Sequence, residues 1–314
     1  MENHSYKSVS ELRALREDAG HAGEIVAALF DAGTFVETGA YVKRGSELLE
    51  TKDAGEFEGV VTGYGAIAGR LVFAFIQDAE RCLGAVTAAH ADKICALYDF
   101  AAKSRAPVIG VLSSSGAVVL EGVDVLAGYG RIMRKSASLH GVIPQIALVD
   151  GVCSGLSAAF CSMFDFVVAN ERDARLYIAP PSIMKAKFNA ADAGTVKPQA
   201  PAAAAVDMFG ADTLDAVARV RALLAFLPSS RSDGTVYTVS EDDPSRSCHI
   251  NVTSDNYDMQ QVVASIADRG VFLELQADTA PEMLTGFITF NGRVTALVAN
   301  QPAVKDGMLT AGAS

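Results

Sequence analysis

The chain has 314 residues, half of them apolar and a fifth charged, which is enough for one large globular domain or two ordinary ones. Its formal net charge is −11 and it lacks tryptophan. This composition argues against a nucleic-acid surface, where cationic side chains and stacked aromatic rings supply the affinity. No apolar stretch is long enough to cross a bilayer, and residues 1–10 are too polar for a signal peptide. We therefore expect a cytoplasmic protein with no direct membrane span.

The cysteines are odd in number and scattered, and no two of them form a Cys-x-x-Cys pair. That spacing predicts neither a zinc ribbon nor a redox dithiol. Free thiols in a reducing compartment are the default expectation. The five positions are Cys82, Cys95, Cys153, Cys161 and Cys248.

The first half of the chain alternates strand patterns with helix patterns. Two apolar runs, residues 59–67 and 70–77, flank an Ala68-Gly69 turn and predict a β-hairpin. Residues 85–103 predict a helix. Further strands are predicted at residues 108–112, 143–149, 165–170 and 175–178. Strands alternating with helices predict an α/β fold with a parallel sheet.

Small residues follow two of these strands. The strand at 108–112 leads into three serines and Gly116, and a helical spacing of apolar residues then starts at Val119. The strand at 143–149 leads into Gly151-Val152-Cys153-Ser154-Gly155 and another helix. We call residues 113–117 the first turn and residues 151–156 the second turn. Because backbone N–H groups are unpaired where a helix begins, the two turns predict a pocket lined by amides.

The composition changes after Lys185, where an Ala- and Pro-rich stretch predicts a surface loop. Residues 212–227 predict a helix with Asp212 at its start and Pro228 as its stop. A second α/β unit follows, with an Asn291-Gly292 hairpin turn. The chain ends where a parallel sheet would need its next helix, so this second unit is expected to be incomplete. The predicted division is an N-terminal domain at 1–228, a linker at 229–256 and a partial second domain at 257–314.

With these segments placed, the sequence resembles the biotin-dependent acyl-CoA carboxyltransferases. The similarity is to the propionyl-CoA carboxylase β-chain type, which includes the carboxyltransferase subunits of glutaconyl-CoA and methylmalonyl-CoA decarboxylases. The motifs occur in the family's order along the chain. They are LFDAGTFVE, EGVVTGYG, GRLVFAFIQD, His90-Ala91-Asp92-Lys93-Ile94, APVIGV…EGVDVLAGYGRI, GVIPQIALVDGVCSGLSAA and FLELQAD…GFITFNGRVTALVANQP.

The resemblance implies a crotonase-like α/β fold, a twisted sheet with flanking helices, duplicated as N- and C-terminal domains. On this basis the N-domain is complete here and the C-domain is partial. The family's reaction moves a carboxyl group between N1 of biotin and the α-carbon of an acyl-CoA. Biotin would be carried on a separate protein, and a coenzyme A thioester would be the substrate. Backbone amides would stabilise the developing oxyanions.

The resemblance also implies partners. These are a second carboxyltransferase subunit that completes the C-domain, a biotin carboxyl carrier protein, and biotin carboxylase or decarboxylase subunits, assembled as a homo- or hetero-oligomer. Nothing in it implies nucleic acid or a metal ion.

Carried over residue by residue, the family's S-G-G turn corresponds to Ser114-Ser115-Gly116. The resemblance therefore implies a thioester oxyanion hole formed by the backbone N–H groups of Ser115 and Gly116. The residues implied to bind acyl-CoA come from both turns: Ser114, Ala117, Cys153, Ser154, Gly155 and Leu156.

The turns depart from the family pattern S-G-G-A-R-I-Q-E-G. Ser115 replaces a glycine, Val118 an arginine and Leu120 a glutamine. Leu156 replaces a glycine in the second turn, and Leu83 replaces one upstream. If the backbone needs a positive φ at position 115, serine costs about 1 kcal/mol relative to glycine there.

Three functions follow from these observations. The first is a catalytic carboxyltransferase subunit, or the equivalent part of a biotin-dependent decarboxylase. The second is a degenerate, non-catalytic paralogue that scaffolds such a complex, a reading that the altered signature favours. The third is a crotonase-fold acyl-CoA enzyme without biotin, such as a malonate decarboxylase subunit. The first of these is the function that we predict, with the other two as alternatives.

Overall fold

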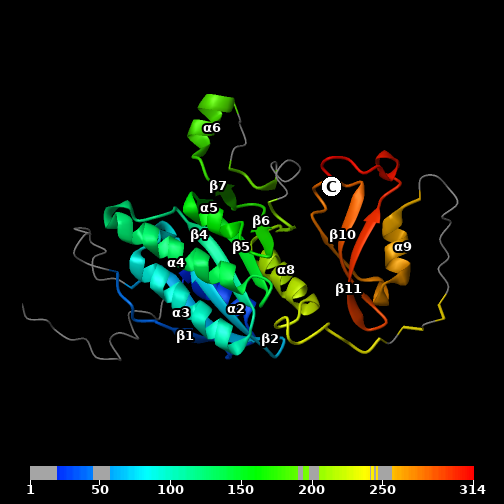
Figure 1. Ribbon diagram of the computed structural model, residues 1–314, viewed down its shortest axis with the longest axis horizontal. Helices are drawn as coiled ribbons and strands as arrows, with labels where there is room; N and C mark the ends of the chain where they lie inside the picture. The colour runs from blue at the N-terminus through cyan, green and yellow to red at the C-terminus, as the bar shows by residue number, and fades with distance from the viewer. Residues whose placement is uncertain are drawn as a thin grey trace, which may run out of the picture.

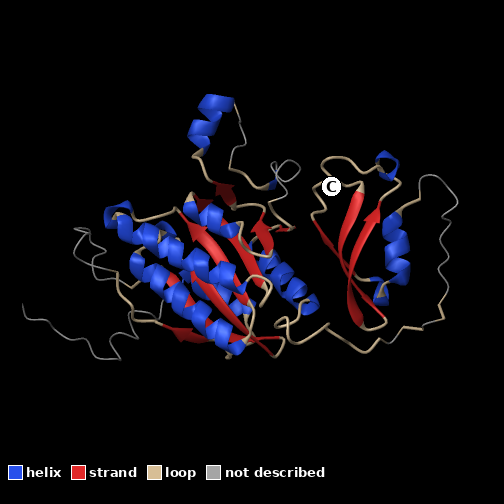
Figure 2. Ribbon diagram, in the orientation of Figure 1, coloured by secondary structure: helices blue, strands red, loops and turns tan. Residues whose placement is uncertain are grey.

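The computed structural model describes residues 20–44, 57–189, 194–197, 205–240, 242–243, 245–246 and 257–314. They form two sheets, an eight-stranded one in the N-terminal part and a three-stranded one in the C-terminal part (Figures 1 and 2). Within this described part, no helix is long and apolar enough to cross a membrane.

The large sheet has the order β1-β2-β3-β4-β5-β6-β8, with β7 paired to the end of β5. The predicted hairpin is confirmed, because β2 and β3 pair antiparallel around the Ala68-Gly69 turn. The remaining neighbours from β3 onward are parallel, as the alternation of strands and helices predicted. The strands are β1 (Val36–Thr38), β2 (Val60–Ile67), β3 (Arg70–Gln77), β4 (Val108–Ser114), β5 (Gln145–Ser154), β6 (Phe166–Asn170), β7 (Arg175–Tyr177) and β8 (Met208–Gly210).

Helices cover both faces of this sheet. One apolar core lies between the sheet and α3 (Ala88–Ser104), α4 (Val123–Leu139) and α5 (Leu156–Cys161). The other lies between the sheet and α2 (Gly20–Leu29) and α8 (Thr213–Phe226). The parallel strands are apolar on both faces because both faces are covered. A further helix, α6 (Pro181–Phe188), projects away from the sheet in Figure 1.

The helix ends follow capping chemistry. Thr87 caps α3 by accepting a hydrogen bond from the His90 N–H at 2.9 Å, and Asp212 caps α8 by accepting from the Asp215 N–H at 3.0 Å. The apolar residues that signalled a helix after the first turn lie in a short 3-10 turn, η2 (Val119–Glu121), and in the start of α4. The expected helix is therefore present, and these apolar side chains lie on its exposed side. These exposed residues are Val119, Leu120, Val123 and Leu126.

The C-terminal part is a hairpin with one further strand and a helix. It contains α9 (Met259–Ile266), η4 (Asp268–Gly270), β9 (Phe272–Leu275), β10 (Met283–Phe290), β11 (Arg293–Asn300) and η5 (Lys305–Gly307). The predicted Asn291-Gly292 turn joins β10 to β11, with both residues at positive φ, as this hairpin turn requires.

Aromatic rings join the two sheets. Phe287 of β10 stacks on Phe226 of α8, with ring centroids 6.3 Å apart, and meets Phe166 of β6 edge-on at 6.1 Å. Gln276 adds hydrogen bonds to Asp207 from both its backbone and its side chain. Part of the predicted linker is also held: residues 236–238 hydrogen-bond to the β10–β11 hairpin. Residues 247–256 of that linker lie outside the described residues.

Candidate functional site

The two turns lie side by side at the carboxyl ends of β4 and β5. Ser114 and Cys153 are register partners in these parallel strands. The Ser154 hydroxyl donates a hydrogen bond of 2.8 Å to the Ser115 carbonyl, which joins the turns directly. In open parallel sheets, ligands bind at this edge. The two turns that the sequence singled out are thus neighbours in the structure.

The backbone of the first turn needs glycine at a different position from the one expected. Gly116 has a φ of +111°, whereas Ser115 is not among the described residues with positive φ. Serine at position 115 therefore carries no left-handed strain, and the expected cost of about 1 kcal/mol does not arise.

The amides predicted to form the oxyanion hole have partners inside the protein. The Ser115 N–H donates to the Leu83 carbonyl at 3.0 Å, and the Gly116 N–H donates to the Ser114 hydroxyl at 3.2 Å. Val86 brackets the same turn by donating to the Gly116 carbonyl and accepting from the Val118 N–H. The Ala117 N–H, between these contacts, has no acceptor among the described residues.

The second turn leaves the Leu156 N–H unpaired because helix α5 begins at this residue. The Gly155 N–H donates to the Tyr177 carbonyl at 3.0 Å, and Gly155 has a φ of +59°. Leu156 is the first residue of α5, where N–H groups have no intrahelical acceptor. Among the described residues, its N–H also has no other acceptor. The turns therefore present two unpaired N–H groups, those of Ala117 and Leu156.

Two of the residues expected to contact acyl-CoA are buried in the core. Ser114 is 1% exposed and Cys153 is 0% exposed. A hydrogen bond to Cys161 and burial raise the pKa of the Cys153 thiol well above its usual value, so it is not a nucleophile. The four described cysteines are free thiols, and Cys248 lies outside the described residues. Of the other predicted contacts, Ser154, Gly155, Leu156 and Ala117 are at least partly accessible.

The ionisable side chains near the turns serve the fold. His90 is fully buried, and burial lowers its pKa to about 3, which keeps it neutral. Glu121 accepts the Ala88 N–H at 2.6 Å and so holds the start of α3. Within the described residues, no group of three or more His, Cys, Asp or Glu side chains could hold a metal ion. The site therefore offers backbone dipoles for stabilising charge.

A basic hollow borders the second turn, and the sequence reasoning missed it. It has a volume of about 390 Å³ and contains Arg172, Arg175 and Lys197, with Glu171 as its carboxylate. Arg175 belongs to β7, the strand that pairs with residues 152–154 of β5. Lys197 pairs with Glu171 at 2.7 Å and Arg172 pairs with Asp173 at 2.9 Å. Among the described residues, Arg175 is therefore the cation of this hollow that has no carboxylate partner. The signal available in the sequence was the pair of arginines around β7.

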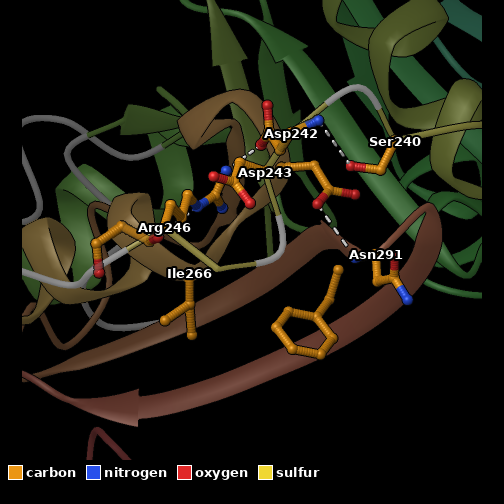
Figure 3. Close-up of a pocket in the computed structure, with 9 residues that line it drawn as sticks. Ser240, Asp242, Asp243, Arg246, Ile266 and Asn291 are labelled. Carbon is orange, nitrogen blue, oxygen red and sulfur yellow. Dashed lines mark hydrogen bonds and ion pairs between the residues drawn. The ribbon is translucent and has the colours of Figure 1, made fainter.

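A second hollow, of about 290 Å³, lies where Ser240, residues 242–243 and Arg246 meet the β10–β11 turn (Figure 3). Its carboxylates are engaged in internal contacts. Asp242 pairs with Arg246, and Asp268 accepts the N–H groups of Asn291 and Gly292 at 3.1 and 2.7 Å. Asp268 thus fixes the hairpin turn to η4, and Asp242, which also accepts the Arg269 N–H at 2.6 Å, ties residues 242–243 to η4. These contacts indicate a structural junction.

Comparison with known proteins identifies the family of the chain. The carboxyl transferase domain family matches residues 21–314. The propionyl-CoA carboxylase beta chain of Roseobacter denitrificans is 35% identical, over 94% of this chain and 61% of that protein. The methylmalonyl-CoA decarboxylase subunit alpha of Veillonella parvula is also 35% identical, over 93% of this chain and 60% of that protein.

A solved structure matches as well. Transcarboxylase 12S, determined as a hexamer with methylmalonyl-coenzyme A and methylmalonic acid bound, superposes with a TM-score of 0.88 at 29% identity. The match covers 96% of this chain and 62% of that one. The chain thus spans about three fifths of the length of these relatives. The fold is the expected crotonase-like α/β fold, and the chain belongs to the carboxyl transferase domain family.

Proposed function

We propose that this chain is a carboxyltransferase subunit that binds an acyl-CoA thioester and moves a carboxyl group between its α-carbon and biotin. The single observation that supports this most directly is the pair of unpaired N–H groups, Ala117 and Leu156, on adjacent turns. Family membership and the acyl-CoA relatives support the substrate class.

In this proposal the thioester oxygen accepts both N–H groups. When the α-carbon loses a proton or a carboxyl group, negative charge develops on that oxygen as the enolate forms. Fixed amide dipoles in a partly buried turn stabilise this charge, and each donor contributes about 3–4 kcal/mol to lowering the barrier. The Ala117 and Leu156 pair replaces the Ser115 and Gly116 pair implied by the sequence, because those amides bond within the protein.

The basic hollow would receive phosphate groups of coenzyme A. It adjoins the second turn through β7, and arginine forks suit phosphate oxygens. The apolar rim made by Leu120, Val123 and Leu156 would shield the acyl chain from water. The N-terminal part, residues 1–228, is thus the acyl-CoA domain in this proposal.

Biotin, attached to a separate carrier protein, would supply or accept the carboxyl group, and we assign none of the described residues to it. The proposed partners are that carrier, biotin carboxylase or decarboxylase subunits and a further carboxyltransferase subunit, in a cytoplasmic oligomer. The relatives include a carboxylase chain and a decarboxylase subunit, and both directions share the same enolate.

The test is carboxyl transfer in the complex isolated with the full chain, using propionyl-CoA and methylmalonyl-CoA as probes and a biotin-blocked complex as the control. We expect biotin-dependent transfer and calorimetric binding of the acyl-CoA to the chain. Binding without transfer under all conditions would contradict catalysis and support the scaffold. Transfer that persists after biotin is blocked would support a biotin-independent decarboxylase.

A further inference from the structure

One short segment, residues 82–87, packs against the first turn and hydrogen-bonds to its backbone. Three of its backbone groups bond to that turn: Leu83 accepts from Ser115 at 3.0 Å, and Val86 donates to Gly116 at 2.8 Å and accepts from Val118 at 2.9 Å. The contact is close, because a Cβ on Gly84 would lie 1.9 Å from the Ser113 carbonyl oxygen. The position of the Ala117 N–H therefore depends on this segment.

The 82–87 segment holds a strained conformation. Cys82 and Leu83 have φ values of +49° and +53°, followed by Gly84 at +62°. Residues other than glycine rarely adopt this left-handed region, and they remain there only where the surroundings enforce it. Something must therefore hold both ends of the segment.

Two buried charged side chains make those contacts. At one end, Arg44 Nη1 donates to the Cys82 Sγ at 2.9 Å. At the other, the Thr87 hydroxyl donates to Glu58 Oε1 at 2.8 Å. Arg44 and Glu58 are each only 3% exposed. Both come from one local structure, because the Glu58 N–H donates to the Val42 carbonyl at 2.9 Å.

The cost of these side chains indicates that they do more than fill space. Arg44 Nε and Glu58 Oε2 have no hydrogen-bond partner among the described residues. Burial raises the pKa of Glu58, although the Thr87 hydrogen bond and the charges of Arg44 and Lys93 oppose the rise. Partly satisfied buried charges are expensive, and apolar side chains of similar volume generally pack such a region more stably. What Arg44 and Glu58 supply is a directional contact at each end of the 82–87 segment.

We propose that Arg44 and Glu58 are positioning residues: they grip the two ends of the 82–87 segment and thereby fix the first turn, with its free Ala117 N–H, opposite the Leu156 N–H of the second turn. Neither side chain touches the substrate. Glu58 acts through Thr87 and Val86, and Arg44 acts through Cys82 and Leu83. We call this pair of contacts the clamp. Its role in catalysis rests on the proposed function. The mechanical claim, that the clamp fixes the backbone of the first turn, does not.

The mechanical claim is tested by residue-resolved hydrogen exchange on the full chain, read at the Ser115 and Val118 amides. Thr87→Val removes the hydroxyl that Glu58 holds, and Thr87→Ser keeps it. We expect exchange at both amides to speed up about tenfold in Thr87→Val, as for the loss of one buried hydrogen bond, and to stay near wild type in Thr87→Ser.

Thr87 also caps α3, so the Glu58 variants below, which leave that cap in place, separate the clamp from the capping of α3. Loss of a remote helix cap serves as a further control. Asp212→Ala removes the cap of α8 and should leave Ser115 and Val118 unchanged. If Thr87→Val does not fold, Glu58→Met against Glu58→Gln gives the same comparison, because glutamine keeps the acceptor for Thr87. Unchanged exchange in Thr87→Val or Glu58→Met, or an equal rise in Asp212→Ala, would overturn the proposal.

Carboxyl transfer supplies the functional readout. We expect kcat to fall about tenfold in Thr87→Val with little change in KM for the acyl-CoA, and to recover in Thr87→Ser, since oxyanion donors act mainly in the transition state. Wild-type chain that shows no transfer at all would end the proposed function, while the exchange data would still decide the clamp. Faster exchange with an unchanged kcat would overturn the positioning role.

Discussion

Each of the two turns leaves one backbone N–H unpaired, but the structural reason differs between them. In the second turn, a helix start leaves the Leu156 N–H unpaired, and β7 anchors the preceding glycine. In the first turn, α4 begins only at Val123, and the Ala117 N–H is left free because the 82–87 segment engages the amides around it. One amide follows from local backbone geometry, and the other depends on contacts from distant parts of the chain.

This difference teaches which turn tolerates sequence change. The second turn needs little beyond a glycine at positive φ and a helix start, so leucine can replace glycine at position 156 without losing the N–H. The first turn relies on a strained neighbour, which is itself held by buried charges. Removing the contacts that hold this neighbour should therefore also perturb the first turn.

The largest expected effect comes from removing the Leu156 N–H. Proline is accepted at the first position of a helix, so Leu156→Pro should delete the donor while preserving the fold. We expect carboxyl transfer to fall about 10²–10³-fold, the usual loss for one oxyanion donor. Leu156→Ala removes the side chain and keeps the N–H, and should stay within about threefold of wild type. Equal rates in the two variants would refute the assignment.

The next largest effect is on the free energy of unfolding, at Gly84 in the 82–87 segment. Gly84→Ala places a Cβ against the Ser113 carbonyl at positive φ, and should lower the free energy of unfolding by about 3 kcal/mol or more. Gly69→Ala, in the β2–β3 turn, is the matched control: it also has positive φ but no atom within 4 Å, and should cost about 1 kcal/mol. Urea unfolding of both variants measures the difference. Similar losses would show that the contact with Ser113 is unimportant.

A smaller effect, of opposite sign, is expected at the strained neighbour. Leu83 has a φ of +53° and is 69% exposed, so Leu83→Gly relieves strain and loses little packing. We expect it to stabilise the fold by about 0.5–1 kcal/mol after the entropy of glycine is included. Leu120→Gly, at an exposed position without positive φ, should give no such gain. The urea midpoints of the two variants decide this.

The smallest effect is a pH dependence on the β5 side of the site. Burial lowers the pKa of His21, but hydrogen bonds and charge from Asp150 and Glu24 outweigh it, so the pKa is raised above 6.5. A raised pKa means that the charged pair with Asp150, 2.6 Å away, stabilises the fold fully below pH 6.5. This stabilisation fades as pH rises through the folded-state pKa. The stability difference between wild type and His21→Gln should shrink over that range, and a difference that grows would contradict the pairing.

The sequence predicted the architecture because the fold has strong local signals. Alternating strands and helices gave the parallel sheet, Ala68-Gly69 and Asn291-Gly292 gave the two hairpins, and Asp212 gave the start of α8. The two turns were also found, because small residues follow apolar strands there.

The choice of amides could not be predicted in the same way. Which N–H is free depends on partners far along the chain, such as Leu83 for Ser115 and Tyr177 for Gly155. The helical spacing of the apolar residues in η2 and α4 did indicate a helix, but spacing alone does not reveal that their side chains lie on the surface rather than in the core. The positive φ at Gly116 instead of Ser115 was likewise set by the shape of the loop.

The most direct test of the central claim is the infrared stretch of the thioester carbonyl in bound acyl-CoA. With carbonyl-labelled propionyl-CoA on the full chain, hydrogen bonds from Ala117 and Leu156 should move the stretch to lower frequency than in water, because fixed donors polarise the carbonyl more than mobile solvent does. The shift should persist in Leu156→Ala and diminish in Leu156→Pro. A ligand that binds with an unshifted stretch, or with the same shift in Leu156→Pro, would contradict the account.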